Sequence, residues 1–487
     1  MKNHKETEGS LKPSLKARHM TMIALGGSIG TGLFLASGSA ISSSGPGGAL
    51  LAYAAVGLMV YFLMNSLGEL ATYLPDSGSF STYASRFVSP AFGFAVGWNF
   101  WYNWAITIAA ELAAATVIIK FWFPDSPSAL WSLLFLLIMF GLNFLSTKSF
   151  GESEFWFAII KIITVIVFLT LGVLMIFGII GGESVGLKNF NLGGSSFHGG
   201  FFAFVGVFMA AGFSFQGTEL IGVAAGESEN PRKNVPRAIR QVFWRILIFY
   251  VCSIFVIGML IPYTDPSLLN SDLNNIGVSP FTLLFEKAGL AFAAAVMNAV
   301  ILSSVLSAGN SGMYAATRVL YSMAKNGLAP KFLGKLNRRS IPVNALILTT
   351  SVGMLAFLAS FFGDGVVYIW LLNASGMCGF INWLAISVCH YRFRRAFLAQ
   401  GHSLKELPFI ARWFPAGPIF AFILCLIAIF GQNLGAFTGD SIDWYGIVVS
   451  YISIPLFLMI WFGYRWVKKT KVIPLEQCDL STIDHRG

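Results

Sequence analysis

The chain has 487 residues, of which 56% are hydrophobic and 11% are charged, and its formal net charge is +10. Soluble domains contain about one quarter charged residues, so this composition, with a mean hydropathy of +0.71, excludes an ordinary soluble protein and indicates an integral membrane protein. The 50 Gly and 46 Phe residues favour a helical bundle, because closely packed membrane helices use small residues and membrane interfaces use aromatic ones.

Twelve stretches are long and apolar enough to cross a bilayer, which needs about 20 residues per helix. They are residues 20–43, 48–73, 91–119, 129–147, 155–181, 199–225, 239–262, 280–317, 342–362, 366–390, 415–434 and 444–466. Residues 1–19 are polar and basic and do not resemble a cleavable signal peptide, so we expect a cytoplasmic N-terminal tail that stays in the mature protein. The pattern predicts an all-α membrane protein with twelve transmembrane helices.

Positive charge is unevenly distributed between the two ends of these spans. With both termini cytoplasmic, all 32 Lys and Arg residues fall at cytoplasmic ends except Lys120, Lys188 and Lys287, which lie outside, and Lys161, which lies within a span. This asymmetry follows the positive-inside rule and would be lost if the helix count changed by one. We interpret the basic clusters as topology anchors and contacts to anionic membrane lipids, and we expect no nucleic-acid partner, because no soluble domain presents them.

Two of the spans are interrupted in the middle. The first contains Gly-Gly-Ser-Ile-Gly-Thr-Gly at residues 26–32, and the sixth contains Gly-Phe-Ser-Phe-Gln-Gly-Thr at residues 212–218. Irregular backbone at membrane depth is tolerated only where it is buried in protein or lines a cavity, so these breaks mark a candidate transport site. Close helix packing through glycine is the alternative explanation.

Breaks in helices 1 and 6 suggest that helices 1–5 and 6–10 repeat one five-helix plan. An odd number of helices per repeat places the halves in opposite orientations, which predicts a five-plus-five inverted repeat with its site at the bilayer midplane. We therefore divide the chain into a cytoplasmic tail (1–19), a transport core (20–390), a cytoplasmic loop (391–414), helices 11 and 12 (415–466) and a second cytoplasmic tail (467–487).

Ionisable residues inside the spans are candidates for function, because an uncompensated charge in a membrane helix costs roughly 2.5 to 3.5 kcal/mol. Lys161 in the fifth span can load and release a proton, or can be a static partner for a carboxylate. Glu111 in the third span and Glu219 after the second break can face a cationic substrate, take part in protonation or bond neighbouring helices. Glu69 is better explained as a loop or gate contact.

Other chemistries are disfavoured. The five cysteines are an odd number, four lie within apolar helices, and none has zinc-site spacing, so packing is the default explanation. No phosphate-binding loop or catalytic constellation is present, so we expect neither an ATP-driven pump nor an enzyme, and we expect no metal and no cofactor. A gradient must then supply the energy.

Two long motifs resemble a known family. Residues 68–71 and 75–80 (GELA and PDSGSF) and residues 227–238 (ESENPRKNVPRA) resemble signatures of the amino acid permeases of the APC superfamily, which has the LeuT-like fold. The resemblance runs from residues 15–19 (LKARH) to the twelfth helix. Residues 213–222 (FSFQGTELIG), with 102–104 (YNW) and 391–395 (YRFRR), are most similar to the bacterial lysine-specific permeases. The resemblance implies proton-coupled import of L-lysine across the bacterial inner membrane.

The resemblance and the two breaks together suggest roles for individual residues. In the first break, backbone amides and the Thr31 hydroxyl would meet the substrate carboxylate; in the sixth helix, carbonyls would meet its α-ammonium, while Phe213 or Phe215 closes over it or belongs to the core. The resemblance implies that Lys161 takes the place of a coupling cation. The candidate substrate-binding residues are Ser28, Ile29, Gly30, Thr31, Gly32, Tyr102, Glu111, Phe213, Ser214, Phe215, Gln216, Thr218, Glu219 and Asn310.

Two alternatives remain open at the level of sequence. A basic amino acid exchanger of the same fold would need counter-substrate inside vesicles, and a lysine-binding membrane sensor would bind without transporting. The sequence identifies no regulatory protein partner.

Overall fold

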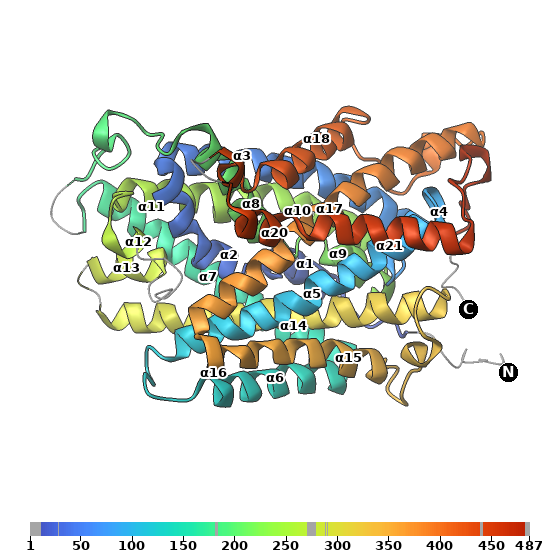
Figure 1. The fold of residues 1–487 in the computed structure, drawn as a ribbon, viewed down its shortest axis with the longest axis horizontal. Coiled ribbons are helices and arrows are strands. Elements are labelled where there is room, and N and C mark those ends of the chain that lie inside the picture. The colour runs from blue at the N-terminus through green and yellow to red at the C-terminus, as the bar shows by residue number, and fades with distance from the viewer. Residues whose placement is uncertain are drawn as a thin grey trace.

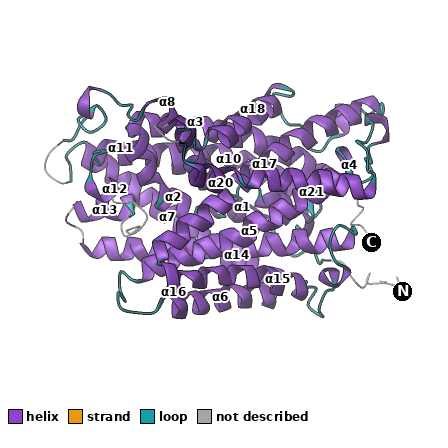
Figure 2. Cartoon of the chain, viewed as in Figure 1, coloured by secondary structure: helices purple, strands orange, loops and turns teal. Residues whose placement is uncertain are grey.

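A computed structural model of the chain describes residues 11–27, 29–180, 184–269, 279–287, 289, 291–438 and 442–482. Within these ranges the regular structure is helical, apart from one isolated parallel bridge between Leu15 and Ser228 (Figure 2). Most of the long helices run along the long axis of the molecule, and α6 and α15 form a layer outside α14 (Figure 1). The predicted all-α fold is confirmed for the described residues.

The first part of the chain contains the first predicted break. Its helices are α1 (Ala17–Gly26), α2 (Thr31–Phe34), α3 (Ala36–Tyr73), α4 (Ser79–Phe87), α5 (Pro90–Ile119), α6 (Ser128–Leu145) and α7 (Thr147–Ile176). Helical structure stops after Gly26 and resumes at Thr31, so the break overlaps residues 26–32 as predicted. Within α3, Gly45 has a φ of 75° and is followed by Pro46, so helical geometry is interrupted there, between the first two predicted spans.

The middle of the chain contains the second break. Its helices are α8 (Gly200–Phe215), α9 (Leu220–Ala224), α10 (Pro231–Arg245), α11 (Cys252–Leu260), α12 (Pro266–Leu269), α13 (Pro280–Lys287) and α14 (Ala291–Lys325), and a π-helical segment, Ile246–Val251, joins α10 to α11. Residues 216–219 separate α8 from α9, close to the predicted break. The span predicted at 280–317 is instead two helices, because Gly289, at a φ of 74°, separates α13 from α14.

The last part of the chain contains α15 (Val343–Gly353), α16 (Ala359–Phe362), α17 (Asp364–Ala399), α18 (Ala416–Gly431), α19 (Gly435–Thr438), α20 (Trp444–Tyr451) and α21 (Ser453–Lys468). Helix α17 continues nine residues past the predicted end at 390, because the added turns stay packed: the Phe393 ring lies 5.1 Å from that of Tyr73, and Arg394 Nε donates to Glu69 Oε1 at 2.8 Å. The predicted loop is correspondingly shorter.

Eight helical stretches of the described residues are long and apolar enough to cross a membrane, and three of them consist of consecutive shorter helices: α8 with α9, α10 with α11, and α15 with α16. The bent pair α20 and α21 raises the count to nine. Helix α18 is apolar but shorter. Of the eight, α5 is the most enclosed, and it packs against α14 and α17 on either side. Its start is fixed by Ser89, whose side chain accepts from the Phe92 amide at 3.1 Å, and by Pro90 in the first turn. Helix α5 is therefore a rigid support for the side chains it carries.

The described ends of the chain lie at one end of the bundle. Ser14 and Leu15 amides donate to the Glu227 carbonyl at 2.9 and 3.0 Å, and the Tyr73 hydroxyl donates to the Leu480 carbonyl at 2.8 Å. The segment after α9 and the segment after α3 are in direct contact there, since a Cβ on Gly226 would lie 2.4 Å from the Ser77 nitrogen. We call this end of the molecule the terminal end.

Candidate functional site

The two broken segments meet in the middle of the bundle. Gly32, in α2, lies so close to α8 that a Cβ there would be 2.4 Å from Ser214 Cα and 2.7 Å from Ser214 N. No real side chain tolerates such distances to backbone atoms, so glycine at this position is what allows α2 to touch α8. The contact places the first break beside the end of α8, as the interrupted spans predicted.

A small cavity lies beside this contact. It is lined by Gly27, Gly30, Gly32, Trp104, Thr107, Glu111, Phe213, Gln216 and Ala308. These residues come from both breaks, from α5 and from α14. The space open to the centre of a water molecule is about 10 Å³, about enough for one water. An amino acid can enter only if some of the lining side chains move.

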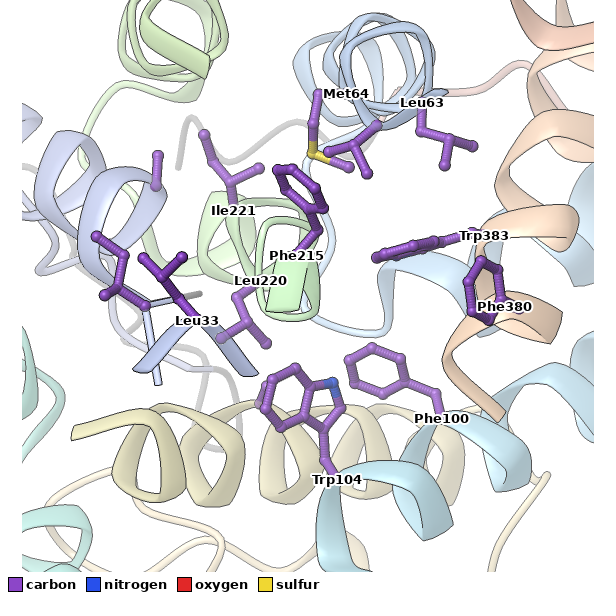
Figure 3. Packing of buried hydrophobic residues seen from close by; sticks show 14 of the residues in the cluster. Leu33, Leu63, Met64, Phe100, Trp104, Phe215, Leu220, Ile221, Phe380 and Trp383 are labelled. Atoms are coloured by element: carbon purple, nitrogen blue, oxygen red, sulfur yellow. The ribbon is translucent and has the colours of Figure 1, made fainter. Parts of the chain in front are cut away.

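Aromatic side chains of α5, α8 and α17 belong to the buried packing near the two breaks (Figure 3). Phe100 and Trp104 lie on α5 with ring centroids 6.4 Å apart, and Phe380 and Trp383 lie on α17 with centroids 5.3 Å apart. The Phe215 ring, at the end of α8, packs 4.1 Å from the ring of Tyr250. Phe213 lines the cavity, whereas Phe215 belongs to this surrounding packing. Of the two candidates for closing over a substrate, Phe213 is therefore the one placed at the cavity.

Glu111 places a carboxyl group in the cavity wall. Its side chain is 3% exposed, and Oε1 accepts from the Thr31 hydroxyl at 3.1 Å. The same oxygen would lie 3.0 Å from a Cβ on Gly30, so the carboxylate sits directly against the first break. Oε2 accepts no hydrogen bond from the described residues. A buried carboxylate with a free oxygen at a cavity wall suits a cationic group.

Glu219 lies in the second break but does not line the cavity. Its Oε2 accepts from the Gly217 amide at 3.1 Å and from Trp383 Nε1 at 3.2 Å. The Thr218 hydroxyl approaches the same oxygen at 3.4 Å. These donors join the irregular segment to α17, so in this conformation Glu219 helps to hold the break in shape.

Lys161 is fully buried and binds the end of α1. Its Nζ donates to the Gly26 carbonyl at 2.8 Å and to the Ser307 hydroxyl at 3.0 Å, so it links α7 with α1 and α14. A second buried cation, Arg245 of α10, donates to the Ala24 carbonyl of the same helix end. Both charges lie at the C-terminus of α1, where the helix dipole favours cations. Sequence reasoning had placed Arg245 at a cytoplasmic end and had singled out Lys161 alone.

The structure does not bring all the candidate residues to the cavity. Tyr102 is 39% exposed and lies in a different groove, with Trp98 of α5, Cys378 of α17 and Phe457 of α21. Asn310 is buried among polar side chains of α6 and α7. Of the remaining candidates, Ile29, Thr31, Ser214 and Thr218 are buried near the breaks, and Ser28 lies outside the described residues.

Sequence reasoning missed several groups that the fold places at or near the site. Trp104 and Ala308 line the cavity, and Glu154 accepts hydrogen bonds beside Lys161. Glu154 precedes Lys161 by seven residues, which is two helical turns, so the two share one face of α7. That spacing, between two ionisable residues at the start and middle of an apolar helix, is the signal that would have identified Glu154.

A buried ion pair joins the segment after α9 to α14 at the terminal end. Arg318 Nε donates to Glu227 Oε1 at 2.9 Å, and both side chains are 1% exposed. The Tyr314 hydroxyl donates to the same carboxylate at 2.9 Å and the Thr147 hydroxyl at 2.6 Å. The carboxylate thus holds α7, α14 and the segment after α9 together.

Removing one partner of this pair is expected to destabilise the protein strongly. Arg318→Met leaves the Glu227 carboxylate buried without its cation, which costs about 3 to 5 kcal/mol. We expect a clear fall in the apparent melting temperature of the detergent-solubilised protein, partly restored in the double variant Arg318→Met/Glu227→Gln. Arg412→Met, at an exposed loop arginine, is the matched control. Equal melting temperatures for Arg318→Met and the control would show that the pair contributes little.

Comparison with known proteins identifies the class of molecule. The profile of the amino acid permease family matches residues 19–475. The chain is 61% identical over 484 residues to a lysine-specific permease of Escherichia coli, covering 99% of both chains. It is 53% identical over 481 residues to a lysine-specific permease of Lactococcus lactis, covering 98% of this chain and 94% of the relative. It is also 51% identical over 478 residues to a histidine permease of Lactococcus lactis, covering 98% and 99%. The family match includes every residue that lines the cavity.

Proposed function

The chain belongs to the amino acid permease family, and from this premise we propose that it imports L-lysine by proton symport. Permeases are transporters and not enzymes, and two of the relatives are named lysine-specific. The observation that carries the proposal is Glu111, a buried carboxylate with a free oxygen in the wall of the cavity at the two breaks. A cationic side chain is the substrate feature that such a group selects.

The binding mode that we propose uses both breaks. The lysine carboxylate binds backbone amides at the first break and the Thr31 hydroxyl, which releases its hydrogen bond to Glu111 to do so. The α-ammonium binds carbonyls at the end of α8. The side-chain ammonium binds Glu111, while Phe213 and Gln216 close over the ligand. To bind the side-chain ammonium in place of Glu111, Glu219 would have to give up the hydrogen bond that it accepts from Trp383.

Proton coupling is assigned to Lys161. Because its Nζ bonds the Gly26 carbonyl, the charge on Lys161 affects how firmly α1 is held against α7 and α14. Import then proceeds by alternating access, in which the contacts at the terminal end, including the Glu227–Arg318 pair, separate to release lysine and the proton inside. Two charges would cross per cycle, worth about 4.6 kcal/mol per 100 mV. That energy supports about thousandfold accumulation.

The proposed architecture has twelve transmembrane helices with an inverted repeat of helices 1–5 and 6–10. Support comes from the interruption of α3 at Gly45, which divides one long helix into two spans, and from the facing breaks at α1–α2 and α8–α9. We place the protein in the bacterial inner membrane with both termini cytoplasmic, because this orientation follows the positive-inside rule. Membrane lipids and protons are then its partners, with no cofactor and no nucleic acid.

The proposal is tested by uptake of labelled lysine into sodium-free proteoliposomes, with and without an inside-alkaline pH gradient. We expect gradient-dependent uptake that excess unlabelled lysine blocks and phenylalanine does not, with arginine and histidine as further competitors. Uptake only into vesicles preloaded with amino acid would indicate an exchanger. Tight binding without uptake would indicate a sensor, and uptake blocked by histidine as well as lysine would remove the assigned specificity.

A further inference from the structure

A row of buried polar residues lies between α7 and α14, interrupted by Phe150 of α7, whose ring stacks on that of Tyr314 with the centroids 4.1 Å apart. Three polar residues of α7 are seven positions apart and share one face: Thr147, Glu154 and Lys161. The facing residues of α14 are spaced by three and four positions: Ser307, Asn310, Tyr314 and Arg318. Hydrogen bonds cross between the two helices at both ends of this α7–α14 seam. Such a row of buried polar groups in otherwise apolar helices requires an explanation beyond packing.

In the middle of the seam, both carboxylate oxygens of Glu154 accept a hydrogen bond. The Ser307 hydroxyl donates to Glu154 Oε2 at 2.6 Å, and Asn310 Nδ2 donates to Glu154 Oε1 at 2.7 Å. Asn310 is itself fixed by Asn143 of α6, whose Nδ2 donates to Asn310 Oδ1 at 2.8 Å. Glu154, Ser307 and Asn310 are all 1% exposed or less.

Ser307 connects this carboxylate to Lys161. Its oxygen accepts from Lys161 Nζ at 3.0 Å while its hydroxyl proton points to Glu154 at 2.6 Å. One hydroxyl therefore bridges a buried ammonium and a buried carboxylate, with donor and acceptor arranged in one direction. This is the geometry that a proton relay requires.

We propose that Glu154 is a second proton carrier, which receives the coupling proton from Lys161 through Ser307 and releases it at the terminal end. The inference rests on the proposed proton symport. In the transfer, one N–H bond of the Lys161 ammonium breaks as Ser307 Oγ gains that proton. The Ser307 hydroxyl proton forms a new O–H bond on Glu154 Oε2. The ammonium becomes a neutral amine, the carboxylate becomes a carboxylic acid, and the number of protons is unchanged.

The position of Glu154 gives the relay a direction. Glu111 faces the cavity, Lys161 binds the end of α1, and Glu154 lies two turns nearer to Thr147, which contacts the terminal end through Glu227. The proposed topology places that end in the cytoplasm. Transfer neutralises both charges in an apolar surrounding, and loss of the ammonium weakens the bond to the Gly26 carbonyl that holds α1. Release of the proton from Glu154 would then accompany inward opening.

Several of the other charged groups near α7 have partners of their own. The titratable or charged side chains on the helices packed against α7 are Arg18 and His19 of α1, Cys252 of α11 and Tyr314, Arg318, Tyr321 and Lys325 of α14, with Glu111 of α5 close by. Those of α1 pair with Glu152, and Tyr314 and Arg318 bond Glu227. Among the described residues, Lys161 is thus the cation that faces Glu154.

The test uses Glu154→Gln in proteoliposomes with the membrane potential clamped at zero and a pH difference of one unit. One proton per lysine allows the wild type to concentrate lysine about tenfold. The variant is expected to equilibrate lysine without concentrating it and to retain counterflow. Glu152→Gln, on the same helix but 32% exposed and outside the seam, is the matched control and is expected to accumulate lysine like the wild type.

A second pair of variants covers the possibility that Glu154→Gln does not fold. Ser307→Ala interrupts the relay and leaves both charged groups in place, whereas Ser307→Thr keeps the hydroxyl. We expect pH-driven uptake to slow in Ser307→Ala relative to counterflow and to recover in Ser307→Thr. Tenfold accumulation by Glu154→Gln, or equal pH-driven rates for the two Ser307 variants, would overturn the proposal while leaving proton symport intact. If the wild type accumulated no more lysine with the pH gradient than without it, proton symport itself would be overturned.

Discussion

The Lys161→Ala variant is expected to carry lysine across the membrane without concentrating it, even under an imposed pH gradient. The substitution removes the ammonium that bonds the Gly26 carbonyl and Ser307, and with it the group to which we assign coupling. Lys161 does not line the cavity, so substrate binding and exchange should persist. The measurement compares pH-driven accumulation with counterflow of labelled lysine in the same proteoliposome preparation.

A loss of folding must be separated from a loss of coupling. Removing Lys161 leaves Glu154 buried without a cation, which can cost about 3 to 5 kcal/mol. Retained counterflow shows that the variant is folded, and a variant without counterflow is checked by its melting temperature in detergent. Lys335→Ala, at an exposed lysine, is the control and should behave like the wild type. Normal accumulation by Lys161→Ala would contradict the coupling role. Loss of both counterflow and accumulation in a folded variant would show that Lys161 is needed for the whole transport cycle.

The position of the site could be predicted from the sequence because its signals are local. Glycine-rich interruptions in two apolar spans predicted the breaks, and the structure places α2 against α8 at Gly32. Glu111 and Lys161 stood out because charged side chains in apolar helices are costly unless they have a role. The boundaries were less accurate: α17 continues to Ala399 because contacts with Glu69 and Tyr73, remote in sequence, stabilise its last turns.

The phase of a helix decides which of its residues reach the site. Tyr102 and Glu111 lie nine residues apart on α5, and at 100° per residue they point to opposite sides of the helix. Glu111 therefore faces the cavity while Tyr102 faces the groove beside α21. Trp104 and Thr107, seven and four residues before Glu111, share its face and line the cavity. This difference follows from spacing alone once one residue of α5 is known to face the site.

Contacts between remote helices could not be predicted. Asn310 was a candidate substrate ligand, but its amide bonds Glu154 of α7 and its oxygen accepts from Asn143 of α6. Nothing local to these three residues shows that α6, α7 and α14 meet at this level. Such pairings depend on how the helices pack, which the one-dimensional pattern of apolar residues does not encode.

Gly32→Ala is expected to abolish lysine uptake and to lower the melting temperature of the protein. The added Cβ would lie 2.4 Å from Ser214 Cα and 3.0 Å from the Phe213 carbonyl carbon, so backbone atoms of α8 have to move. Overpacking of this kind costs about 1 to 3 kcal/mol in a well-packed interior. The displacement falls at the contact between the two breaks. The backbone amides of the first break and the carbonyls of α8 that we propose to bind lysine are therefore moved apart as well.

Gly141→Ala is the matched control for this prediction, because Gly141 lies within α6 and a Cβ there meets no atom within 4 Å. Alanine is favoured over glycine in helices by about 1 kcal/mol, so this variant should be as stable as the wild type or more stable, with normal uptake. Uptake and melting temperature are measured for both variants at equal amounts of reconstituted protein. Wild-type behaviour of Gly32→Ala would show that α2 and α8 can separate without cost. The close contact of the broken helices would then not be what shapes the binding site.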